Sequence, residues 1–519
     1  MSNNMLQELI LPWLRWLFAV VAGTVIGLSM DGEQGIGWLF GSVVSLVFAA
    51  WLIIVHPRDF ISNTLLAAGF YATAFRWLLG AYGGVMGGGW MALVLLFSVL
   101  QAATIYAWAL AISNVNLRIL VFPFALVAGE YARHVFAKAG DGNGLTMCLL
   151  GQIPAQIDLL IQIADIGGVW MLSFLFGVAA VGVVVWFIPN TPKRLSLGVG
   201  GASLVIWFVA IAYGTIQLNQ YSAAKELASG SSQMELWLLD RKVRGEWSQM
   251  LQDRLAKTNL DASSRQVVAL LPEIAFEWNA TEPTSEQLRF LELAENPVLT
   301  IVTGVWLKDQ RELSAAKNSL FILEHGEIST SVDKLCRVPF IEQRLWLTDW
   351  MLHAGLVPEH LIGSVGDSLP IDEAYWEQTD LVVRPSVCYD IYFSESFRRY
   401  PTAGYSINTC SLSELFDAWG GYQRLSHLHG KLRAVEFRRP LASCSLGGFS
   451  GVFDEVGREV EPQEVQDGLS VYHVRPTNHV TLYWHWGDWF PQLCVVVCFV
   501  GVVFDKWGVW SVAVTREKR

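Results

Sequence analysis

Residues 381–393 read Leu-Val-Val-Arg-Pro-Ser-Val-Cys-Tyr-Asp-Ile-Tyr-Phe, an apolar run that reaches Cys388 where a strand should end. The first part, Leu381–Arg384, has the β-branched composition of a buried strand. Residues that carry chemistry concentrate at strand ends and on the loops that follow them. The stretch therefore predicts an α/β fold with a cysteine at the end of one strand.

The same pattern continues on both sides of this stretch, between residues 218 and 480. Short β-like runs alternate there with helical stretches at 284–296 and 423–439. This alternation favours one layered α/β domain. The predicted buried strands are Val267–Leu271, Val298–Val302, Leu320–Leu323, Leu381–Arg384 and Tyr405–Asn408.

Two other segments place polar residues at predicted strand ends. The run 267–273 ends in Glu273, and the segment 333–342 supplies Lys334 and Glu342. A carboxylate, a lysine and a cysteine can carry out covalent acyl transfer. The carboxylate takes the thiol proton, the thiolate attacks a carbonyl, and the ammonium stabilises the oxyanion. The spacing leaves open the alternative of one buried cysteine and two surface charges.

Outside this domain the chain is strongly apolar. It is 53% hydrophobic and only 16% charged, with a mean hydropathy of +0.37, whereas about a quarter of a soluble protein is charged. Eight apolar segments of about 20 residues are each long enough to cross a bilayer. They lie near 10–30, 36–55, 61–81, 90–113, 119–137, 166–188, 195–217 and 486–505. The sequence predicts membrane helices at 1–217, a catalytic domain at 218–480, and a last membrane helix with a tail at 481–519.

Basic residues in the short loops predict the orientation of these helices. With the N-terminus in the cytoplasm, the cytoplasmic loops hold residues such as Arg58, Arg118 and Lys193, while the first opposite loop holds Asp31 and Glu33. Lysine and arginine favour the cytoplasmic side. The large domain is therefore expected outside the cytoplasm.

Two features of the membrane region allow further predictions. Glu130 and Arg133 lie on one helical face, either as a lipid-headgroup contact or as an interfacial ion pair that fixes helix packing. The segment 145–165 is apolar but interrupted by Pro154 and Asp158. It is expected to be interfacial or re-entrant rather than a span.

The net charge of the chain and the spacing of its cysteines and histidines indicate which partners are not expected. The net charge of −11 argues against a nucleic-acid partner, which requires a basic face. The seven cysteines form no CxxC motif, and His427 and His429 point to different faces of a helix. No cofactor or metal is therefore predicted.

Several segments resemble those of a known superfamily. Cys388–Glu395, Leu271–Glu273 and Lys334 resemble the cysteine, glutamate and lysine motifs of the nitrilase (carbon–nitrogen hydrolase) superfamily. Over nearly the whole chain, the order of motifs and the topology resemble its membrane-bound branch, the apolipoprotein N-acyltransferases. The other segments that carry this resemblance are Glu130–Arg133, Gly168–Phe174, Lys334–Glu342, Arg433–Leu441, Thr481–Tyr483 and Gly487–Trp489. It implies a polytopic helical bundle plus an extracytoplasmic nitrilase-like α/β/β/α sandwich.

The resemblance also implies a role for each site residue. Cys388 takes an acyl chain from a phospholipid as a thioester, Glu273 is the general base, and Lys334 stabilises the oxyanion. Glu342 orients the lysine or assists proton transfer. The residues expected to bind substrate are Tyr389, Asp390 and, on a looser match, Trp247.

The implied partners are lipids in the bilayer. The acyl donor is a phospholipid, and the acceptor is the α-amine of a lipoprotein's diacylglyceryl cysteine or another amine. The implied location is the bacterial inner membrane, with the catalytic domain on the periplasmic side.

Some positions depart from the family pattern. Asp390 replaces the usual Glu, Leu271 replaces the Trp of a Trp-Pro-Glu motif, and 416–420 reads Phe-Asp-Ala-Trp-Gly where the family has Asn-Asp-x-Trp-Phe. These changes concern the acceptor side more than the nucleophile. Two alternatives follow: a conjugal-transfer protein of the same architecture, carried by plasmids, and a catalytically idle membrane scaffold.

Overall fold

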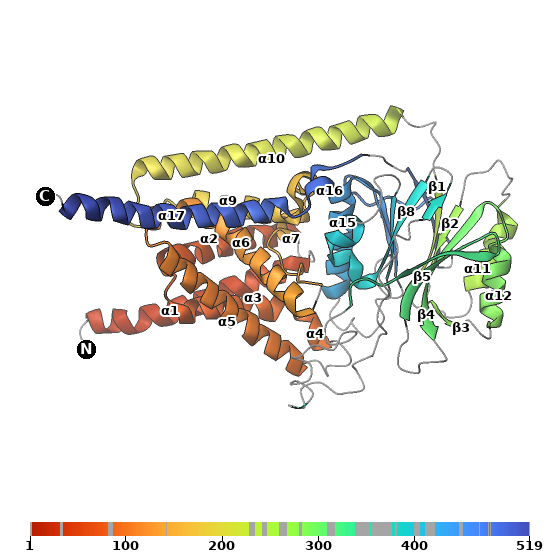
Figure 1. The fold of residues 1–519 in the computed structure, drawn as a ribbon, viewed down its shortest axis with the longest axis horizontal. Coiled ribbons are helices and arrows are strands. Elements are labelled where there is room, and N and C mark those ends of the chain that lie inside the picture. Colours follow the sequence, from red (N-terminus) through yellow and green to blue (C-terminus); the bar gives the residue numbers. More distant parts are fainter. Residues whose placement is uncertain are drawn as a thin grey trace. The chain divides into compact units, whose positions relative to one another are not determined.

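The chain folds into two compact units in this computed structural model. One unit is Met1–Ile216 with Asp488–Arg519, and the other is Gln217–Gly487. The first is helical and the second combines strands with helices (Figure 1). The described residues are 3–31, 35–80, 87–141, 143–227, 234–240, 247–258, 267–273, 275–279, 283–308, 317–337, 353, 376–378, 381–398, 405–410, 421–445, 450–466, 468–475, 477 and 479–517.

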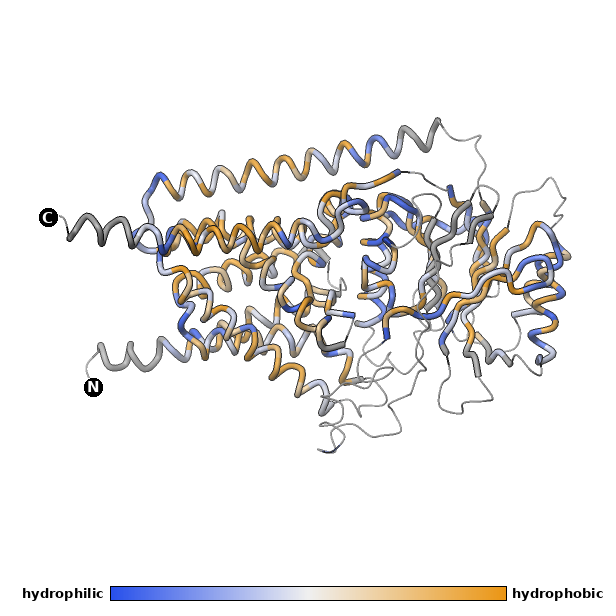
Figure 2. The backbone as a smooth tube through the Cα atoms, in the orientation of Figure 1, coloured by the Kyte–Doolittle hydropathy of each residue, from blue (hydrophilic) through white to orange (hydrophobic). Residues whose placement is uncertain are grey.

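The helices of the first unit coincide with the eight predicted apolar segments. Six of the described helices contain a stretch long and apolar enough to cross a membrane, and Figure 2 shows apolar residues along their length. The other two are α1, whose apolar stretch is limited to Pro12–Leu28, and α3, which ends after 15 residues. The chain is a multi-pass membrane protein. The main helices are α1 (Asn3–Leu28), α2 (Gly35–Val55), α3 (Phe60–Ala74), α4 (Trp77–Gly80), α5 (Gly87–Ala111), α6 (Val115–Asp141), α9 (Ala164–Val184), α10 (Lys193–Leu227) and α17 (Trp489–Glu517).

The segment 145–165 is not a continuous helix. It contains two four-residue helices, α7 (Gln152–Ala155) and α8 (Asp158–Ile161), and its polar Gln152 is fully buried. The prediction that this segment is no ordinary span is confirmed.

Glu130 and Arg133 both bind the connector that precedes α7. Arg133 donates through Nη2 to the carbonyl of Cys148 at 2.7 Å and through Nη1 to the Tyr71 hydroxyl at 2.8 Å. Glu130 accepts the main-chain N–H of Leu150 at 2.6 Å. Buried charges are tolerated where such hydrogen bonds satisfy them. These contacts favour the packing interpretation, with the connector as the partner of both side chains.

The second unit contains two β-sheets. One has eight strands in the order β12-β13-β1-β2-β4-β5-β6 with β3 beside β4, and the other has five in the order β11-β10-β9-β8-β7. Strands β1, β2 and β4 run parallel, as do β8, β9 and β10. The strands are β1 (Met234–Leu239), β2 (Val267–Leu270), β3 (Phe276–Asn279), β4 (Leu299–Lys308), β5 (Lys317–Glu324), β6 (Glu327–Asp333), β7 (Trp376–Gln378), β8 (Leu381–Val387), β9 (Tyr405–Cys410), β10 (Leu441–Ser445), β11 (Gly451–Phe453), β12 (Glu464–Gln466) and β13 (Leu469–Val474).

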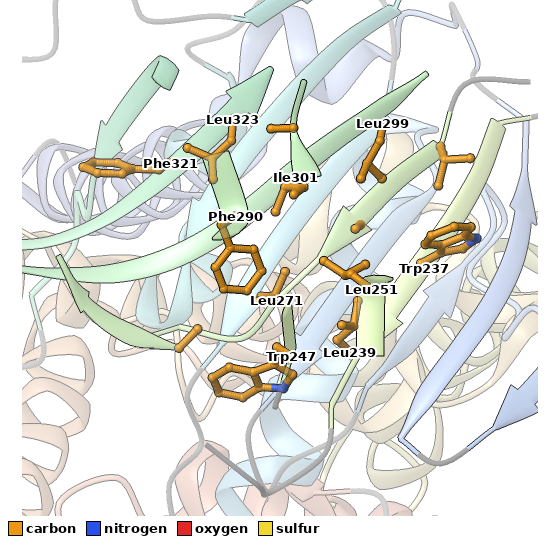
Figure 3. Packing of buried hydrophobic residues seen from close by; sticks show 14 of the residues in the cluster. Trp237, Leu239, Trp247, Leu251, Leu271, Phe290, Leu299, Ile301, Phe321 and Leu323 are labelled. Carbon is orange, nitrogen blue, oxygen red and sulfur yellow. The ribbon is translucent and has the colours of Figure 1, made fainter. Parts of the chain in front are cut away.

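Helices cover the outer faces of this pair of sheets. Helices α11 (Trp247–Lys257) and α12 (Ser285–Leu293) lie on the first sheet. Their apolar residues, such as Leu251 and Phe290, pack with Leu271 and Ile301 in one buried cluster (Figure 3). Fully burying one such side chain contributes about 1.5–3 kcal/mol. Helix α15 (Gly421–Phe437) packs against β10 and β11 of the second sheet, which confirms the predicted α/β/β/α order of layers.

A capping box explains why α12 begins where it does. The Thr284 hydroxyl accepts the main-chain N–H of Gln287 at 3.3 Å, and the Gln287 side chain accepts the N–H of Thr284 in return. This reciprocal pair satisfies two donors that every helix start leaves open. The two predicted helical stretches correspond to α12 and α15, and the five predicted strands to β2, β4, β5, β8 and β9.

Candidate active site

Glu273 and Lys334 are in direct contact inside the second unit. Glu273 follows β2 and Lys334 follows β6, so each lies just beyond the end of a strand. The Lys334 ammonium donates to Glu273 Oε1 at 3.3 Å. Lys334 is 5% exposed and Glu273 is 3% exposed. The structure thus brings together two of the predicted site residues that are 61 positions apart in the chain.

Asn318, on β5, contacts both members of this pair, and the sequence did not single it out. Its Nδ2 donates to Glu273 Oε1 at 2.5 Å. Its main-chain carbonyl accepts the N–H of Lys334 at 2.9 Å. The side chain is 2% exposed, so it belongs to the buried surroundings of the ion pair.

Cys388 occupies a strained turn at the end of β8. It begins the short 3-10 helix η4 (Cys388–Tyr392), directly after the extended Val387. Its φ is +48°, in the left-handed region that a residue with a Cβ enters at a cost of about 1–2 kcal/mol. Such outliers persist where the surrounding structure enforces them, and they cluster at functional sites. The side chain is 7% exposed.

The carboxylate of Asp390 ties the Cys388 turn to the Lys334 segment. Its Oδ2 accepts the main-chain N–H of Val387 at 3.0 Å, and its Oδ1 accepts that of Cys336 at 2.7 Å. The N–H of Leu335 lies 3.4 Å from Oδ2. Asp390 therefore connects the residue before Cys388 to the two residues after Lys334.

Burial dominates the ionisation of this carboxyl group. Asp390 is 1% exposed, and desolvation raises its pKa to about 6, against the opposing effects of its N–H donors and of Lys334. A buried carboxylate that accepts several N–H groups holds the backbone in place. Asp390, predicted to bind substrate, has its carboxylate engaged with main-chain groups.

The remaining predicted site residues lie in different surroundings. Tyr389 is buried beside Phe393, with ring centroids 5.1 Å apart. Trp247 begins α11 and is 1% exposed within the apolar cluster of Figure 3, a position that gives it a packing role. Its part in a lipid-facing pocket stays a prediction. Glu342 lies outside the described residues.

Comparisons with known proteins match parts of the chain well beyond the site residues. A family model described as "Apolipoprotein N-acyltransferase N-terminal domain" matches residues 22–184. An apolipoprotein N-acyltransferase of Gloeobacter violaceus is 28% identical, with 94% of each chain covered. One of Geobacter metallireducens is 24% identical over 93% of this chain and 94% of its own.

Solved structures resemble about half of the chain at low similarity. A Nesterenkonia amidase from the nitrilase superfamily is 18% identical, covering 47% of this chain and 91% of its own, with a TM-score of 0.32. A Saccharomyces cerevisiae member of branch 10 of that superfamily is 15% identical over 47% of this chain and 90% of its own, with a TM-score of 0.33. Over almost all of its length, the chain is similar to apolipoprotein N-acyltransferases, as its motifs predicted.

Proposed function

We propose that the chain is a membrane N-acyltransferase of lipoprotein maturation. It moves an acyl chain from a phospholipid, through a thioester on Cys388, to the N-terminal amine of a diacylglyceryl-cysteine lipoprotein. The observation that carries the proposal is the buried Glu273–Lys334 contact, which Asp390 links to the strained turn of Cys388. The full-length relatives have the same named activity.

In the first half-reaction, Glu273 takes the proton of the Cys388 thiol. The thiolate sulfur bonds to the ester carbonyl carbon of the phospholipid, and the carbonyl oxygen becomes an oxyanion that the Lys334 ammonium stabilises. Collapse of this intermediate breaks the ester C–O bond. The departing alkoxide takes the proton back from Glu273, which leaves a lysophospholipid and an acyl-Cys388 thioester.

In the second half-reaction, the acceptor amine attacks the thioester carbonyl. Glu273 removes the amine proton, Lys334 again stabilises the oxyanion, and the C–S bond breaks. The cysteine sulfur recovers its proton from Glu273, and the product is an amide. The burial of Glu273 and Lys334 strengthens both electrostatic effects because little water screens them.

The finer assignments belong to the same proposal. Tyr389 and Trp247 shape the pocket, Glu342 assists Lys334, and Asp390 supports the nucleophile turn. The protein resides in the bacterial inner membrane with the second unit on the periplasmic side, as the basic cytoplasmic loops favour. Two lipid substrates give a physical reason to tether a catalytic domain to the bilayer.

The relatives favour lipoprotein maturation over a role in plasmid transfer, since the full-length matches are named apolipoprotein N-acyltransferases. The idle-scaffold alternative leaves the Glu273–Lys334 contact without a purpose. A buried ion pair is weak evidence for stability, because the cost of desolvating both charges offsets their attraction.

Complementation tests the proposal. In a bacterial host whose own N-acyltransferase is depleted, this chain should restore growth and the third acyl chain of a reporter lipoprotein, measured by mass spectrometry. The variant Cys388→Ala should restore neither, whereas Cys498→Ala, a cysteine change in α17, should behave as the wild type. Purified wild-type protein with phosphatidylethanolamine should show a hydroxylamine-sensitive acyl group on Cys388. Full lipoprotein acylation by the Cys388→Ala variant would contradict the proposal.

A further inference from the structure

The last residues of the second unit form an exposed apolar surface. Among the described residues of that unit, six large apolar side chains are exposed, and three of them lie close together in the chain: Val480, Leu482 and Trp486. Leu482 and Trp486 are the first and last residues of the short helix α16, and residues four apart lie on one face of a helix. Single exposed apolar residues are ordinary, whereas a cluster marks an interaction surface.

Other parts of α16 bind the segment that follows the nucleophile turn. Tyr483 is buried, and its hydroxyl donates to the Ser394 hydroxyl at 2.8 Å. The Trp484 carbonyl accepts from Arg398 Nε at 3.1 Å. Both partners lie on α14 (Ser394–Arg398), which begins two residues after η4 ends. The helix therefore has an apolar face outward while its other groups are attached to the nucleophile segment.

The hydroxyl of Thr481 fixes the start of α16. It accepts the main-chain N–H of Trp484 at 3.0 Å and donates to the Glu436 carbonyl at 2.6 Å. The first contact caps the helix, and the second attaches the cap to α15. The outward direction of Leu482 and Trp486 is thus set by the fold of the second unit.

The chain continues from α16 directly into a membrane helix. The apolar stretch of α17 begins at Trp489, three residues after Trp486. Three residues of chain reach at most about 11 Å. The headgroup region on each side of the hydrocarbon core is about 5–8 Å thick. Trp486 therefore lies in this region or close beside it.

Hydrogen bonds inside the first unit hold the start of α17 in place. Asp488 accepts the Trp170 indole N–H at 2.9 Å. The Trp489 indole donates to the Ile166 carbonyl at 2.9 Å. Both acceptors and donors belong to that unit, so the point where the chain enters the membrane is fixed.

We propose that α16 is an interfacial anchor, in which Val480, Leu482 and Trp486 bind the headgroup region of the phospholipid bilayer and Tyr483 holds the nucleophile segment near it. Tryptophan concentrates at this depth because its ring is apolar and its N–H forms hydrogen bonds. Continuity with a membrane helix favours lipid as the occupant over a protein. The role toward the nucleophile rests on the proposed function, since a cysteine that takes an acyl chain from a phospholipid must reach the bilayer.

Photocrosslinking tests the membrane contact in the full-length protein in nanodiscs. The photoreactive residue p-benzoylphenylalanine replaces Trp486, and the nanodiscs contain phosphatidylethanolamine with a labelled headgroup. Illumination should attach labelled lipid at position 486, as it should at the exposed Phe504 of α17. Leu288 on α12 is the control, with 54% exposure against 62% for Trp486, and no lipid should attach there.

Two outcomes overturn the inference. One is the absence of labelled lipid at position 486 while Phe504 is labelled. The other is a crosslink from position 486 to a second copy of the chain, which would make this surface a dimer interface. Acyl transfer to Cys388 leaves the headgroup behind, so the label reports contact only.

The rate of acyl-Cys388 formation in the same nanodiscs tests the link to the nucleophile. Trp486→Ser should lower this rate about fivefold, and Trp486→Tyr, which keeps an interfacial aromatic ring, should retain most of it. Leu288→Ser removes an apolar side chain of similar exposure and should match wild type. All three variants should melt like wild type in detergent, because both side chains are exposed. Equal rates for Trp486→Ser and wild type would show that α16 does not hold the nucleophile segment at the bilayer.

Crosslinking needs no acyl transfer, so it is separate from the test of the proposed function. If wild type forms no acyl-Cys388 but lipid attaches at position 486, the acyltransferase assignment fails and the membrane contact of α16 stands. If acyl-Cys388 forms and no lipid attaches at position 486, the reverse holds.

Discussion

The Asp390 carboxylate accepts the main-chain N–H of Cys336 at 2.7 Å, across 54 positions of sequence. Its other oxygen accepts the N–H of Val387, so one side chain fixes both segments of the site. Asp390→Asn keeps a single acceptor oxygen and turns an NH2 group toward an N–H donor. Each buried donor left unsatisfied costs about 1–3 kcal/mol.

We therefore expect Asp390→Asn to lower both the melting temperature and the rate of acyl-Cys388 formation, the latter by at least about tenfold. The control is Asp253→Asn on α11, where the carboxylate accepts only from the exposed Gln249 side chain in the described contacts. Equal acylation rates for Asp390→Asn and wild type would show that the carboxylate does not hold the site together.

The raised pKa of Asp390 makes a distinct prediction about pH. The pKa is about 6 in the folded protein against an ordinary value of 3.8, so between these values the folded state binds more protons than the unfolded state. This contribution to stability is full below about pH 3.8 and is lost as pH rises through 6. From pH 5 to pH 7 the loss amounts to about 1 kcal/mol.

The measurement is the difference in unfolding free energy between wild type and Asp390→Asn at several pH values. The difference cancels other buried carboxyl groups, such as Glu455, whose pKa burial raises to about 7. As pH rises from 5 to 7, the unfolding free energy of wild type should fall relative to that of Asp390→Asn. A difference that does not change with pH would mean that Asp390 does not titrate in this range.

Breaking the buried ion pair at Lys334 should destabilise the second unit. Lys334→Met removes the cation and leaves the Glu273 carboxylate with the Asn318 amide as its described donor. Removing one partner of a buried pair costs about 3–5 kcal/mol. The double variant Glu273→Gln/Lys334→Met should recover part of this stability but no acylation. A double variant whose loss of stability equals the sum of the losses in Glu273→Gln and Lys334→Met would mean that the pair contributes no coupling energy.

The sequence predicted the strand ends of this site better than the contacts between them. Glu273 and Cys388 each follow an apolar run, and strands of this composition end where polar residues begin. Lys334 follows the polar strand β6, which was not among the predicted strands. The partners of Asp390 could not be predicted, because they are main-chain N–H groups, and every residue except proline has one. The burial of Trp247 at the start of α11 was not predicted, and its part in substrate binding stays a prediction.

The position of Asn318 beside Glu273 and Lys334 was not predicted, for a geometric reason. Counting back from the Glu324–Glu327 pair at the hairpin turn places Asn318 opposite Asp333. A β-bulge between Ile322 and Leu323 shifts the register by one, so Ser319 meets Asp333 instead. A one-residue shift changes which side chains share a face, and nothing in this hairpin's sequence marks the bulge.

In the membrane unit, Arg133 should be needed for stability. Its guanidinium donates to the Tyr71 hydroxyl and to the carbonyls of Met147 and Cys148. Arg133→Lys keeps the charge but not this planar fork, so the melting temperature in detergent should fall. Arg194→Lys, at an exposed position near the start of α10, is the matched control. Equal melting of both variants would show that charge alone suffices at position 133.

Gly487 ends α16 (Leu482–Trp486) in an unusual backbone conformation. Its φ of +55° and ψ of −130° are strained for any residue with a Cβ. A Cβ there would also collide with the guanidinium of Arg398, which donates to the Trp484 carbonyl at 3.1 Å. In the same helix, Tyr483 donates to the Ser394 hydroxyl at 2.8 Å, close after the Cys388 turn.

Gly487→Ala should therefore loosen α16 from the segment that follows the nucleophile. We expect a fall in melting temperature that corresponds to about 1–3 kcal/mol and a slower formation of acyl-Cys388. Gly198→Ala makes the same change inside α10, where a Cβ meets nothing within 4 Å, and should be neutral or slightly stabilising because Ala favours helix over Gly. If Gly487→Ala melts and acylates like Gly198→Ala, the backbone at Gly487 adapts freely, and α16 does not hold the nucleophile segment in place.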